Sequence, residues 1–247
     1  MVRDLFLFVP AYQVERELAD LMHSIPAEVL LRTAEICIID DGSSDDTLQV
    51  AKKIAEEEIR TSIRIESFAK NSGYGAVIKF GLSRAKELGK MLHVKYAVCL
   101  HGDGQYSAAA IPAMIQSLEN SEAVLCQGSR LLEKGKARVG KMPLYKFLGG
   151  KILTGIENCV FQNKLTDRHS GLIAYKVNFL QNLPLEKFSA SFDIDFEILA
   201  FADARGFRLN EISIPTHYAG EKSNLRVIPY GLRVLKIALR KKRGFYD

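Results

Sequence analysis

Two clusters of carboxylates and glycines each follow a run of apolar residues in this 247-residue chain. The first covers residues 38–47 (IIDDGSSDDT), and the second covers residues 100–105 (LHGDGQ). An apolar strand that ends in carboxylates and glycines is typical of the carboxyl edge of a parallel sheet, where open α/β sheets bind their ligands. Carboxylates beside tight turns suit a hydrated divalent cation and the hydroxyls of a ribose. The two clusters together predict a site for a metal-bound nucleotide.

The individual residues of the two clusters suit different tasks. Because successive side chains of a strand point to opposite faces, we expect Asp41 to contact a base or ribose while Asp40 holds the turn. Residues 43–46 fit instead the start of a helix. In the second cluster, Asp103 is the candidate ligand for Mg²⁺ or Mn²⁺. His101 could contact a ribose hydroxyl, a phosphate or the metal, or it could be a structural hydrogen-bonding residue.

Three further groups of residues could take part in such a site. Tyr12, just after Pro10 at the end of a strand, could stack on a base or pack on the core. Residues 71–76 (NSGYGA) place two glycines, the first of them Gly73, at a helix start, where bare N–H groups attract phosphate. An ordinary glycine turn is the alternative, because the spacing lacks a full dinucleotide fingerprint. Residues 192–197 (FDIDFE) carry three alternating carboxylates, which either complement the helix dipole or provide a general base.

The composition is that of an ordinary globular protein. Hydrophobic residues make up 47% and charged residues 26% of the chain, which is long enough to bury a proper core. No stretch approaches the roughly 18 uninterrupted apolar residues of a membrane span, and the opening run of residues 5–9 is too short for a signal peptide. The four cysteines form no C-x-x-C pair, which favours buried reduced thiols. We therefore expect a cytoplasmic protein.

The net charge of +5 is concentrated near the C-terminus. The basic residues there are Arg226, Arg233, Lys236, Arg240, Lys241, Lys242 and Arg243. Such a segment can meet an anionic membrane surface or a phosphorylated acceptor, or it can be the solvated face of a helix. Nucleic acid is not among the expected partners.

The pattern of apolar residues predicts alternating strands and helices in the first half of the chain. We expect strands over residues 5–9, 35–39, 63–68, 96–100, 124–127, 172–175 and 207–214. We expect helices over residues 16–24, 45–58, 76–88, 109–118, 145–161 and 194–205, and a last one from about residue 229. Residues 128–140 are rich in Gly, Lys and Arg and are interpreted as a mobile loop that could close over a ligand. The repeated alternation predicts an α/β fold with a mostly parallel sheet and right-handed crossovers.

The order of these motifs resembles that of the family 2 glycosyltransferases, which have the GT-A fold. The shared motifs are residues 9–12 (VPAY), 39–47 (IDDGSSDDT), 71–75 (NSGYG), 101–105 (HGDGQ) and 128–130 (GSR). The second half looks most similar to bacterial relatives of dolichol-phosphate mannose synthase. That similarity rests on residues 142–145 (MPLY), 153–154 (LT), 157–158 (EN), 169–171 (HSG), 195–198 (DFEI) and 211–218 (EISIPTHY). The resemblance covers nearly the whole chain.

The resemblance implies inverting transfer of a sugar from a UDP- or GDP-linked donor, with Mg²⁺ or Mn²⁺, to a polyprenyl phosphate. By similarity, Pro10, Ala11, Tyr12 and Asp41 would hold the nucleoside, Asp103 the metal and diphosphate, and Gln105 the donor sugar. Arg130 and Ser170 would lie near the transferred or accepting phosphate. We add Gly73 and His101 to the donor site and His169 to the acceptor site. Where the acceptor is a hydroxyl, Asp195 is the first candidate for the base and Glu197 the second.

These expectations fit one GT-A domain. Residues 1–127 would bind the nucleotide sugar, residues 128–220 would shape the acceptor site, and residues 221–247 would form a basic tail or helix. The expected location is the cytoplasm, including peripheral attachment at the inner face of the membrane.

Three residues depart from the family pattern. His101 stands where an aspartate is commoner, which leaves one carboxylate fewer for the metal, and Val14 stands where a glutamate is frequent, for which Glu15 could substitute. Ile173 stands where an arginine is usual, which weakens the expectation of an acceptor-phosphate site. Three alternatives stay open: transfer to a sugar hydroxyl of a soluble or polymeric glycan, a nucleotide-sugar-binding module without catalysis, and a nucleotidyltransferase. The last is the least favoured, because no glycine-rich, lysine-bearing loop lies near the N-terminus.

Overall fold

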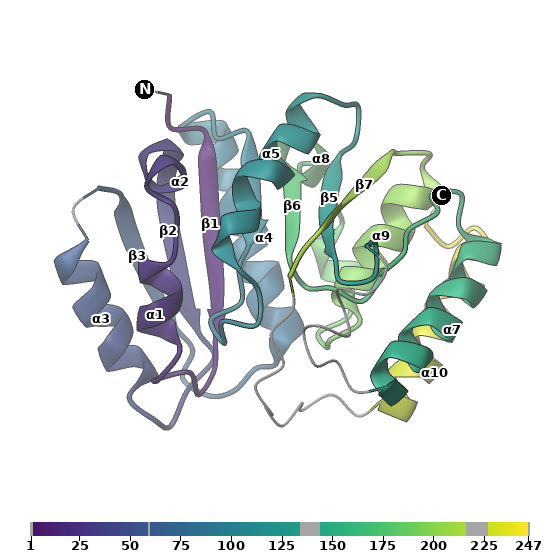
Figure 1. The fold of residues 1–247 in the computed structure, drawn as a ribbon, viewed down its shortest axis with the longest axis horizontal. Coiled ribbons are helices and arrows are strands. Elements are labelled where there is room, and N and C mark those ends of the chain that lie inside the picture. The colour runs from purple at the N-terminus through teal and green to yellow at the C-terminus, as the bar shows by residue number, and fades with distance from the viewer. Residues whose placement is uncertain (1, 59, 134–143, 216–226, 247) are drawn as a thin grey trace.

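The computed structural model describes residues 2–58, 60–133, 144–215 and 227–246, which are built around one mostly parallel sheet (Figure 1). Its strands are β1 (Leu5–Ala11), β2 (Thr33–Asp40), β3 (Ser62–Ser67), β4 (Tyr96–Cys99), β5 (Leu125–Ser129), β6 (Ile173–Lys176) and β7 (Leu209–Ser213). Their order across the sheet is β3-β2-β1-β4-β6-β5-β7. Strand β6 pairs antiparallel with β4 and β5, and the other pairs are parallel. The predicted α/β architecture is confirmed.

Helices cover both faces of the sheet (Figure 1). They are α1 (Leu18–His23), α2 (Ala27–Arg32), α3 (Thr47–Glu57), α4 (Tyr74–Met91), α5 (Ile111–Glu119), α7 (Leu144–Val160), α8 (Val177–Leu180), α9 (Ile194–Ala204) and α10 (Val227–Lys242). Because side chains alternate along a strand, β1 sends Leu5, Leu7 and Val9 into the core under α1, α2, α3 and α5. It sends Phe6 and Phe8 into the other core, under α4, α8 and α9.

The expected elements are present, with boundaries shifted by a few residues. Helices α2 and α8, together with the short 3₁₀ turns at Ala108–Ala110 and Leu185–Lys187, were not expected. Three of the four cysteines are buried as expected, whereas Cys159 is exposed on α7. The loop expected over residues 128–140 begins later, because β5 extends to Ser129. Its residues 134–140, on which the expectation of a closing loop depends, lie outside the described part of the chain.

The carboxyl ends of β1, β2 and β4 meet at one edge of the sheet, because the three strands are parallel neighbours. The N–H of Asp41 donates to the carbonyl of Ala11 at 2.9 Å, and the N–H of Gly102 donates to the carbonyl of Pro10 at 2.9 Å. These two bonds fasten the residues that follow β2 and β4 to the last residues of β1. Both acidic clusters therefore lie at the same edge, as the sequence predicts.

The basic residues of α10 are divided between ion pairs and exposed positions. Arg233 lies 3.4 Å from Asp193, Arg240 lies 3.4 Å from Glu197, and Lys241 lies 2.8 Å from Asp203. Asp193 lies just before α9, Glu197 lies within this helix, and Asp203 lies near its end. Among the exposed basic residues at this end of the chain are Lys236, Lys242 and Arg243. This basic segment is therefore only partly a solvated helix face.

Asp203 is expected to be important for stability, because it is fully buried beneath α10. It accepts hydrogen bonds from Lys241 Nζ and from the backbone N–H groups of Gln162 and Asn163. Burial alone would raise the pKa of Asp203, but Lys241 and these amides hold it below its usual value. We expect Asp203→Ala to lower the free energy of unfolding at pH 7 by about 3 kcal/mol, because Lys241 loses its buried partner. Denaturant titration measures this cost.

Glu57→Ala is the matched control, since its ion pair with Lys53 is 3.9 Å long and largely exposed; its stability should be nearly that of the wild type. A carboxyl whose pKa is lower in the folded than in the unfolded state stabilises the fold at any pH above its unfolded pKa. This stabilisation is lost as the pH falls through the folded-state pKa. The cost of Asp203→Ala should therefore shrink as the pH drops below the ordinary value of 3.8. Equal costs for the two variants would contradict a stabilising role for Asp203.

Among the described residues, no helix combines the length and the apolar character that crossing a membrane requires.

Candidate functional site

The two carboxylates at the end of β2, Asp40 and Asp41, are both buried, and each holds a different backbone segment. Asp40 accepts the N–H of Ser43 at 3.1 Å and the hydroxyl of Ser67 at 2.9 Å, so it holds the turn as expected. Asp41 accepts the N–H of Ser72 at 2.7 Å and that of Gly73 at 3.0 Å. Gly73 has a φ of 90°, which only glycine adopts without strain, and it directly precedes α4. Asp41 therefore fixes the start of α4 beside the edge of the sheet.

The segment after β4 carries the other candidate residues of this edge. Asp103 is half-buried, and its Oδ1 accepts the N–H of Gln105 at 3.1 Å. A Cβ built at Gly104, the next residue in the chain, would meet no atom within 4 Å, so the space beside Gly104 is open. Tyr12, which follows β1, is 37% exposed. The residues expected to form the donor site in the first half of the chain lie at or near this edge: Pro10, Ala11, Tyr12, Asp41, Gly73, His101, Asp103 and Gln105.

A chain of hydrogen bonds joins this edge to the second half of the protein. The hydroxyl of Tyr74, the first residue of α4, donates to Asp195 Oδ2 at 2.7 Å and lies 3.0 Å from His101 Nε2. Asp195 is the second residue of α9. When Asp195 is ionised it accepts the only hydroxyl proton of Tyr74, so His101 Nε2 must carry the proton of the second bond. His101 and Asp195 are thus connected through one tyrosine.

Burial changes the acid–base properties of all three groups. It raises the pKa of Asp195 to about 7, although the hydrogen bond from Tyr74 opposes this shift. It lowers the pKa of His101, although the nearby charge of Asp103 acts in the opposite direction. It also raises the pKa of Tyr74, and the charge of Asp195 adds to that effect. Near neutral pH, the Asp195 carboxyl can therefore hold or release a proton while His101 stays neutral.

His101 and Tyr74 are enclosed by groups whose contacts with them the sequence did not predict. The ring of Tyr106 meets the imidazole edge to face with centroids 5.2 Å apart, and its hydroxyl accepts the N–H of Gly171 at 3.0 Å. A Cβ at Gly171 would lie 2.4 Å from His101 Nε2. The ring of Phe192 stacks on Tyr74 with centroids 5.3 Å apart. Glycine at position 171 is therefore required by the close approach of His101.

Arg130 is held by a buried carboxylate. Its Nε and NH2 groups donate to the two oxygens of Asp167, at 2.6 and 3.0 Å, and NH2 also donates to the carbonyl of His169 at 3.1 Å. Burial alone would raise the pKa of Asp167, but the Arg130 guanidinium holds it below the usual value. The pair fixes the direction of the Arg130 side chain at the end of β5.

The remaining candidates have structural partners. His169 Nε2 lies 3.1 Å from the buried Glu157 Oε1, and the carbonyl of the buried Ser170 accepts the side-chain amide of Gln127 at 2.6 Å. Glu197 accepts the N–H of Ser189 and the hydroxyl of Tyr246, besides pairing with Arg240. Because these contacts direct Glu197 toward α10, Asp195 is the carboxylate of α9 that joins the candidate site.

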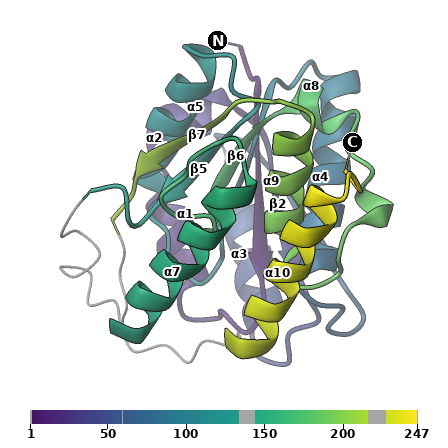
Figure 2. The ribbon, with the colours of Figure 1, turned by 90° about the vertical axis from the view of Figure 1, so that its right-hand side faces the viewer.

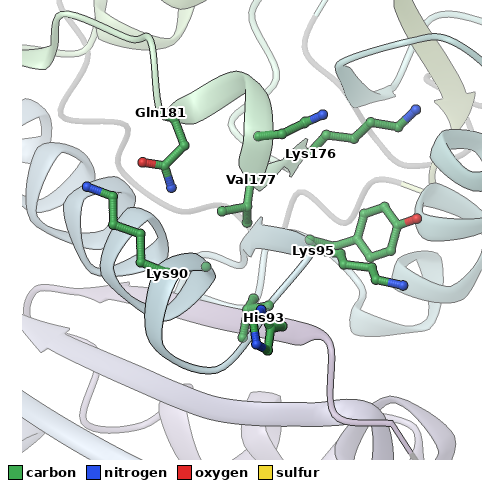
Figure 3. A pocket seen from close by; sticks show the side chains of 10 residues that line it. Lys90, His93, Lys95, Lys176, Val177 and Gln181 are labelled. Atoms are coloured by element: carbon green, nitrogen blue, oxygen red, sulfur yellow. The ribbon is translucent and has the colours of Figure 1, made fainter.

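A pocket lies at the opposite edge of the sheet, where β4 begins (Figure 3). It has a volume of about 680 Å³, and its lining includes Lys90, His93, Lys95 and Lys176. Figure 3 shows that the three lysine side chains point in different directions, and Lys176 Nζ donates to the carbonyl of Ser121. The amino groups of this pocket therefore do not converge on a common ligand. Because the pocket lies at the opposite edge of the sheet, it is separate from the candidate site.

Comparison with known proteins identifies the family. The family model described as "Glycosyl transferase family 2" matches residues 6–183. The UDP-N-acetylglucosamine–dolichyl-phosphate N-acetylglucosaminyltransferase of Methanococcus voltae is 27% identical over 87% of this chain and 86% of its own length. The dodecaprenyl-phosphate galacturonate synthase of Rhizobium johnstonii is 28% identical over 74% of this chain, which spans half of that relative.

Solved structures show the same fold. Glucosyl-3-phosphoglycerate synthase of Mycobacterium tuberculosis, in complex with Mn²⁺, UDP and glucosyl-3-phosphoglycerate, has a TM-score of 0.66 at 17% identity. The match covers 97% of this chain and 80% of that one. The chain therefore belongs to glycosyl transferase family 2 and is a glycosyltransferase with the GT-A fold.

Proposed function

We propose that this glycosyltransferase moves a sugar from a UDP- or GDP-linked donor to a polyprenyl phosphate, with inversion at the anomeric carbon. The observation that carries the proposal is the hydrogen-bond chain from Asp195 through Tyr74 to His101, two residues from Asp103. It places a carboxyl from the second half of the chain beside the strand end where the donor would bind. The names of two relatives, which contain dolichyl phosphate and dodecaprenyl phosphate, support the lipid acceptor.

Pro10, Ala11, Tyr12 and Asp41 are proposed to bind the nucleoside. Tyr12 is partly exposed at this edge, and an aromatic side chain there suits stacking on a base. Each oxygen of Asp41 accepts one backbone N–H and keeps a further lone pair for a hydrogen of the base or ribose. Gly73, at the start of α4, is proposed to approach the diphosphate through its backbone.

Asp103 is proposed as the protein ligand of Mg²⁺ or Mn²⁺. No three His, Cys, Asp or Glu side chains come together as a metal site in the described part of the chain. Mg²⁺ in nucleotide sites is commonly held by one or two carboxylates together with phosphate oxygens, so one aspartate beside open space fits a metal that arrives with the diphosphate. Bound there, the ion would offset the negative charge of the departing diphosphate.

The proposed step is a single displacement. An oxygen of the acceptor forms a bond to the anomeric carbon, while the bond from that carbon to the diphosphate breaks and its electron pair leaves with the diphosphate oxygen. A phosphate monoester has a second pKa near ~6, so a polyprenyl phosphate is largely ionised at neutral pH and needs no base. Arg130, Ser170 and His169 are proposed to face this phosphate, with Asp167 orienting Arg130.

A sugar hydroxyl is the second candidate acceptor, and one observation favours it. The pKa of Asp195, at about 7, is that of a general base suited to neutral pH. A hydroxyl acceptor would need such a base, and Asp195 is proposed for that role. The complex of glucosyl-3-phosphoglycerate synthase, whose product is a phosphorylated glucoside, is consistent with hydroxyl acceptors on this fold.

Gly171→Ala is expected to reduce turnover by roughly 10²-fold, because a displacement of about 1 Å near a reacting group can cost that much. The new methyl group would lie 2.4 Å from His101 Nε2 and 3.2 Å from the hydroxyl of Tyr74, so both side chains must move. Gly155→Ala on α7 is the matched control, since its methyl group would meet nothing within 4 Å. Release of nucleoside diphosphate measures both variants, and full activity of Gly171→Ala would remove His101 from the site.

The proposed function is tested with a panel of UDP- and GDP-linked sugars in the presence of Mn²⁺. Each donor is incubated with a short-chain polyprenyl phosphate or with a soluble glycan, and nucleoside diphosphate release is followed together with the mass of the product. We expect one donor to give a sugar-linked polyprenyl phosphate. Transfer to the glycan alone would overturn the lipid acceptor, and donor binding without turnover on either acceptor would overturn the catalytic proposal.

A further inference from the structure

Helices α7 and α10 carry stripes of exposed apolar side chains. On α7 the stripe consists of Leu148, Ile152 and Ile156, and on α10 it consists of Leu232, Leu235 and Leu239. Ile152 and Leu232 are each 65% exposed. The spacings of four residues on α7, and of three and four on α10, place each set along one side of its helix. Apolar side chains gathered in this way mark a surface that meets a partner.

The two stripes face away from the body of the protein. On α10, the opposite side carries Val234, Ile237 and Ala238, all buried, and on α7 it carries Thr154 and Glu157, also buried. Figure 2 shows α7 and α10 side by side at one face of the molecule, in front of α9, and the two helices contact each other. The outward sides of both helices therefore belong to the same face. We call the six stripe residues the apolar face.

Within α7 and α10, the exposed charged residues that the structure describes are basic. Helix α10 contains no acidic residue, and the only acidic residue of α7 is Glu157, which is fully buried. Lys236, Lys242 and Arg243 are exposed in and after α10. A helix whose apolar stripe is flanked by exposed lysine and arginine has the pattern of helices that lie in the interface of an anionic bilayer.

We propose that α7 and α10 together form a docking surface for an anionic lipid bilayer, with the apolar face inserted among the acyl chains and the basic residues at the headgroups. The part of this surface in catalysis rests on the proposed function, in which the acceptor is a lipid phosphate. A polyprenyl phosphate is confined to the bilayer by its hydrocarbon chain. An enzyme that reaches its phosphate must approach the headgroup region, and this face would hold it there.

The position of the docking surface suits that task. Arg233 of α10 pairs with Asp193, and Arg240 pairs with Glu197 of α9, the helix that carries Asp195. Figures 1 and 2 show that α7 and α10 both begin at the lower side of the molecule, toward which β1 runs. The same helices would therefore connect the bilayer to the edge of the sheet that bears the candidate site.

The test is co-sedimentation of the full chain with vesicles of phosphatidylcholine, with and without phosphatidylglycerol. We expect binding to the anionic vesicles that weakens with salt. The triple variant Ile152→Gln, Leu232→Gln, Leu239→Gln should lose roughly 10²-fold in binding, because three large apolar side chains no longer enter the bilayer. The double variant Lys236→Gln, Lys242→Gln should lose roughly fivefold per charge and most of the salt dependence.

Met91→Gln with Leu92→Gln is the matched control, because both side chains are exposed and apolar but lie at the end of α4. This control should bind vesicles like the wild type. The proposal is overturned if the wild type ignores anionic vesicles, or if the triple variant and the control bind equally well. It is also overturned if light scattering shows that the wild type self-associates through this face and that the triple variant is monomeric.

Turnover separates this inference from the proposed function. The triple variant should transfer sugar to a water-soluble, short-chain polyprenyl phosphate at the wild-type rate, and lose activity only when the long-chain acceptor is presented in vesicles. Vesicle binding by a wild type that uses no polyprenyl phosphate would remove the proposed acceptor while the docking surface stands. Turnover on the short-chain acceptor without any vesicle binding would remove the docking surface while the proposed acceptor stands.

Discussion

Asp103→Asn is expected to lower kcat/KM by roughly 10³-fold while the fold stays intact. Asparagine keeps the shape of the side chain but removes the charge that would hold a divalent cation against the diphosphate. Losing several kcal/mol of stabilisation of the leaving group corresponds to about this factor. Asp103 is half-buried beside open space and is not part of the core, so the melting temperature should change little. Nucleoside diphosphate release at varied Mn²⁺ concentration measures the effect.

Asp46→Asn is the control for that experiment, because it removes an exposed carboxylate from the other acidic cluster. Its turnover and its dependence on Mn²⁺ should match those of the wild type. If Asp103→Asn kept the same apparent affinity for Mn²⁺ as the wild type, Asp103 would not be the metal ligand.

Asp195→Asn has the second largest expected effect, and the effect depends on the acceptor. With a sugar hydroxyl, loss of the general base should cost roughly 10²–10⁴-fold in kcat. With a polyprenyl phosphate, turnover should fall far less, since an ionised phosphate needs no base. The wild type should show a rate that rises with pH through the pKa of Asp195, about 7, with a hydroxyl acceptor. The variant should lack this limb of the profile.

The pH dependence of the folding stability gives an independent measurement of the pKa of Asp195. Burial raises the folded-state pKa of Asp195 from 3.8 to about 7. In that pH interval the unfolded state binds fewer protons than the folded one, so Asp195 makes the wild type less stable as the pH rises. Asp195→Asn should therefore be more stable than the wild type at pH 8 by on the order of 2–4 kcal/mol, and this advantage should disappear near pH 4.

Glu186→Gln, an exposed carboxylate between α8 and α9, is the control and should change neither the pH profile nor the stability. If the wild type lost no stability between pH 4 and pH 8 relative to Asp195→Asn, the raised pKa of Asp195 would be refuted. Equal loss of turnover with both acceptors would show that Asp195 positions other groups instead of acting as a base.

The sheet and its ligand edge could be predicted because local patterns determine them. Strands β1, β2 and β4 each contain a continuous apolar run, as expected for strands buried on both faces. The runs of β2 and β4 lead into carboxylates and glycines, and the parallel pairing of both strands with β1 must then bring those residues to one edge. The role of Asp40 in the turn followed from the alternation of side chains along β2, whereas the contact of Asp41 with a base or ribose stays a prediction. Helix α8, with four residues, is too short for a periodic pattern to reveal it.

The network inside the site could not be predicted because its members are distant in sequence. Tyr74 and Asp195 are separated by 121 positions, and Arg130 and Asp167 by 37. A tyrosine after a glycine turn gives no sign of its partner, and the close approach of Gly171 to His101 is a property of packing alone. The basic residues of α10 posed the same problem, since Lys241 and Lys242 are adjacent but only Lys241 is known to pair with a buried carboxylate.

The central claim is that Asp103 holds a divalent cation against the diphosphate of the donor. Co-crystallisation with Mn²⁺ and either UDP or GDP, followed by anomalous diffraction at the manganese edge, tests it directly. We predict a manganese peak about 2.1 Å from a carboxylate oxygen of Asp103 and in contact with the diphosphate, and no such peak in Asp103→Asn. A nucleotide bound at this edge with manganese ligated elsewhere, and with Asp103 turned away from both, would contradict the account.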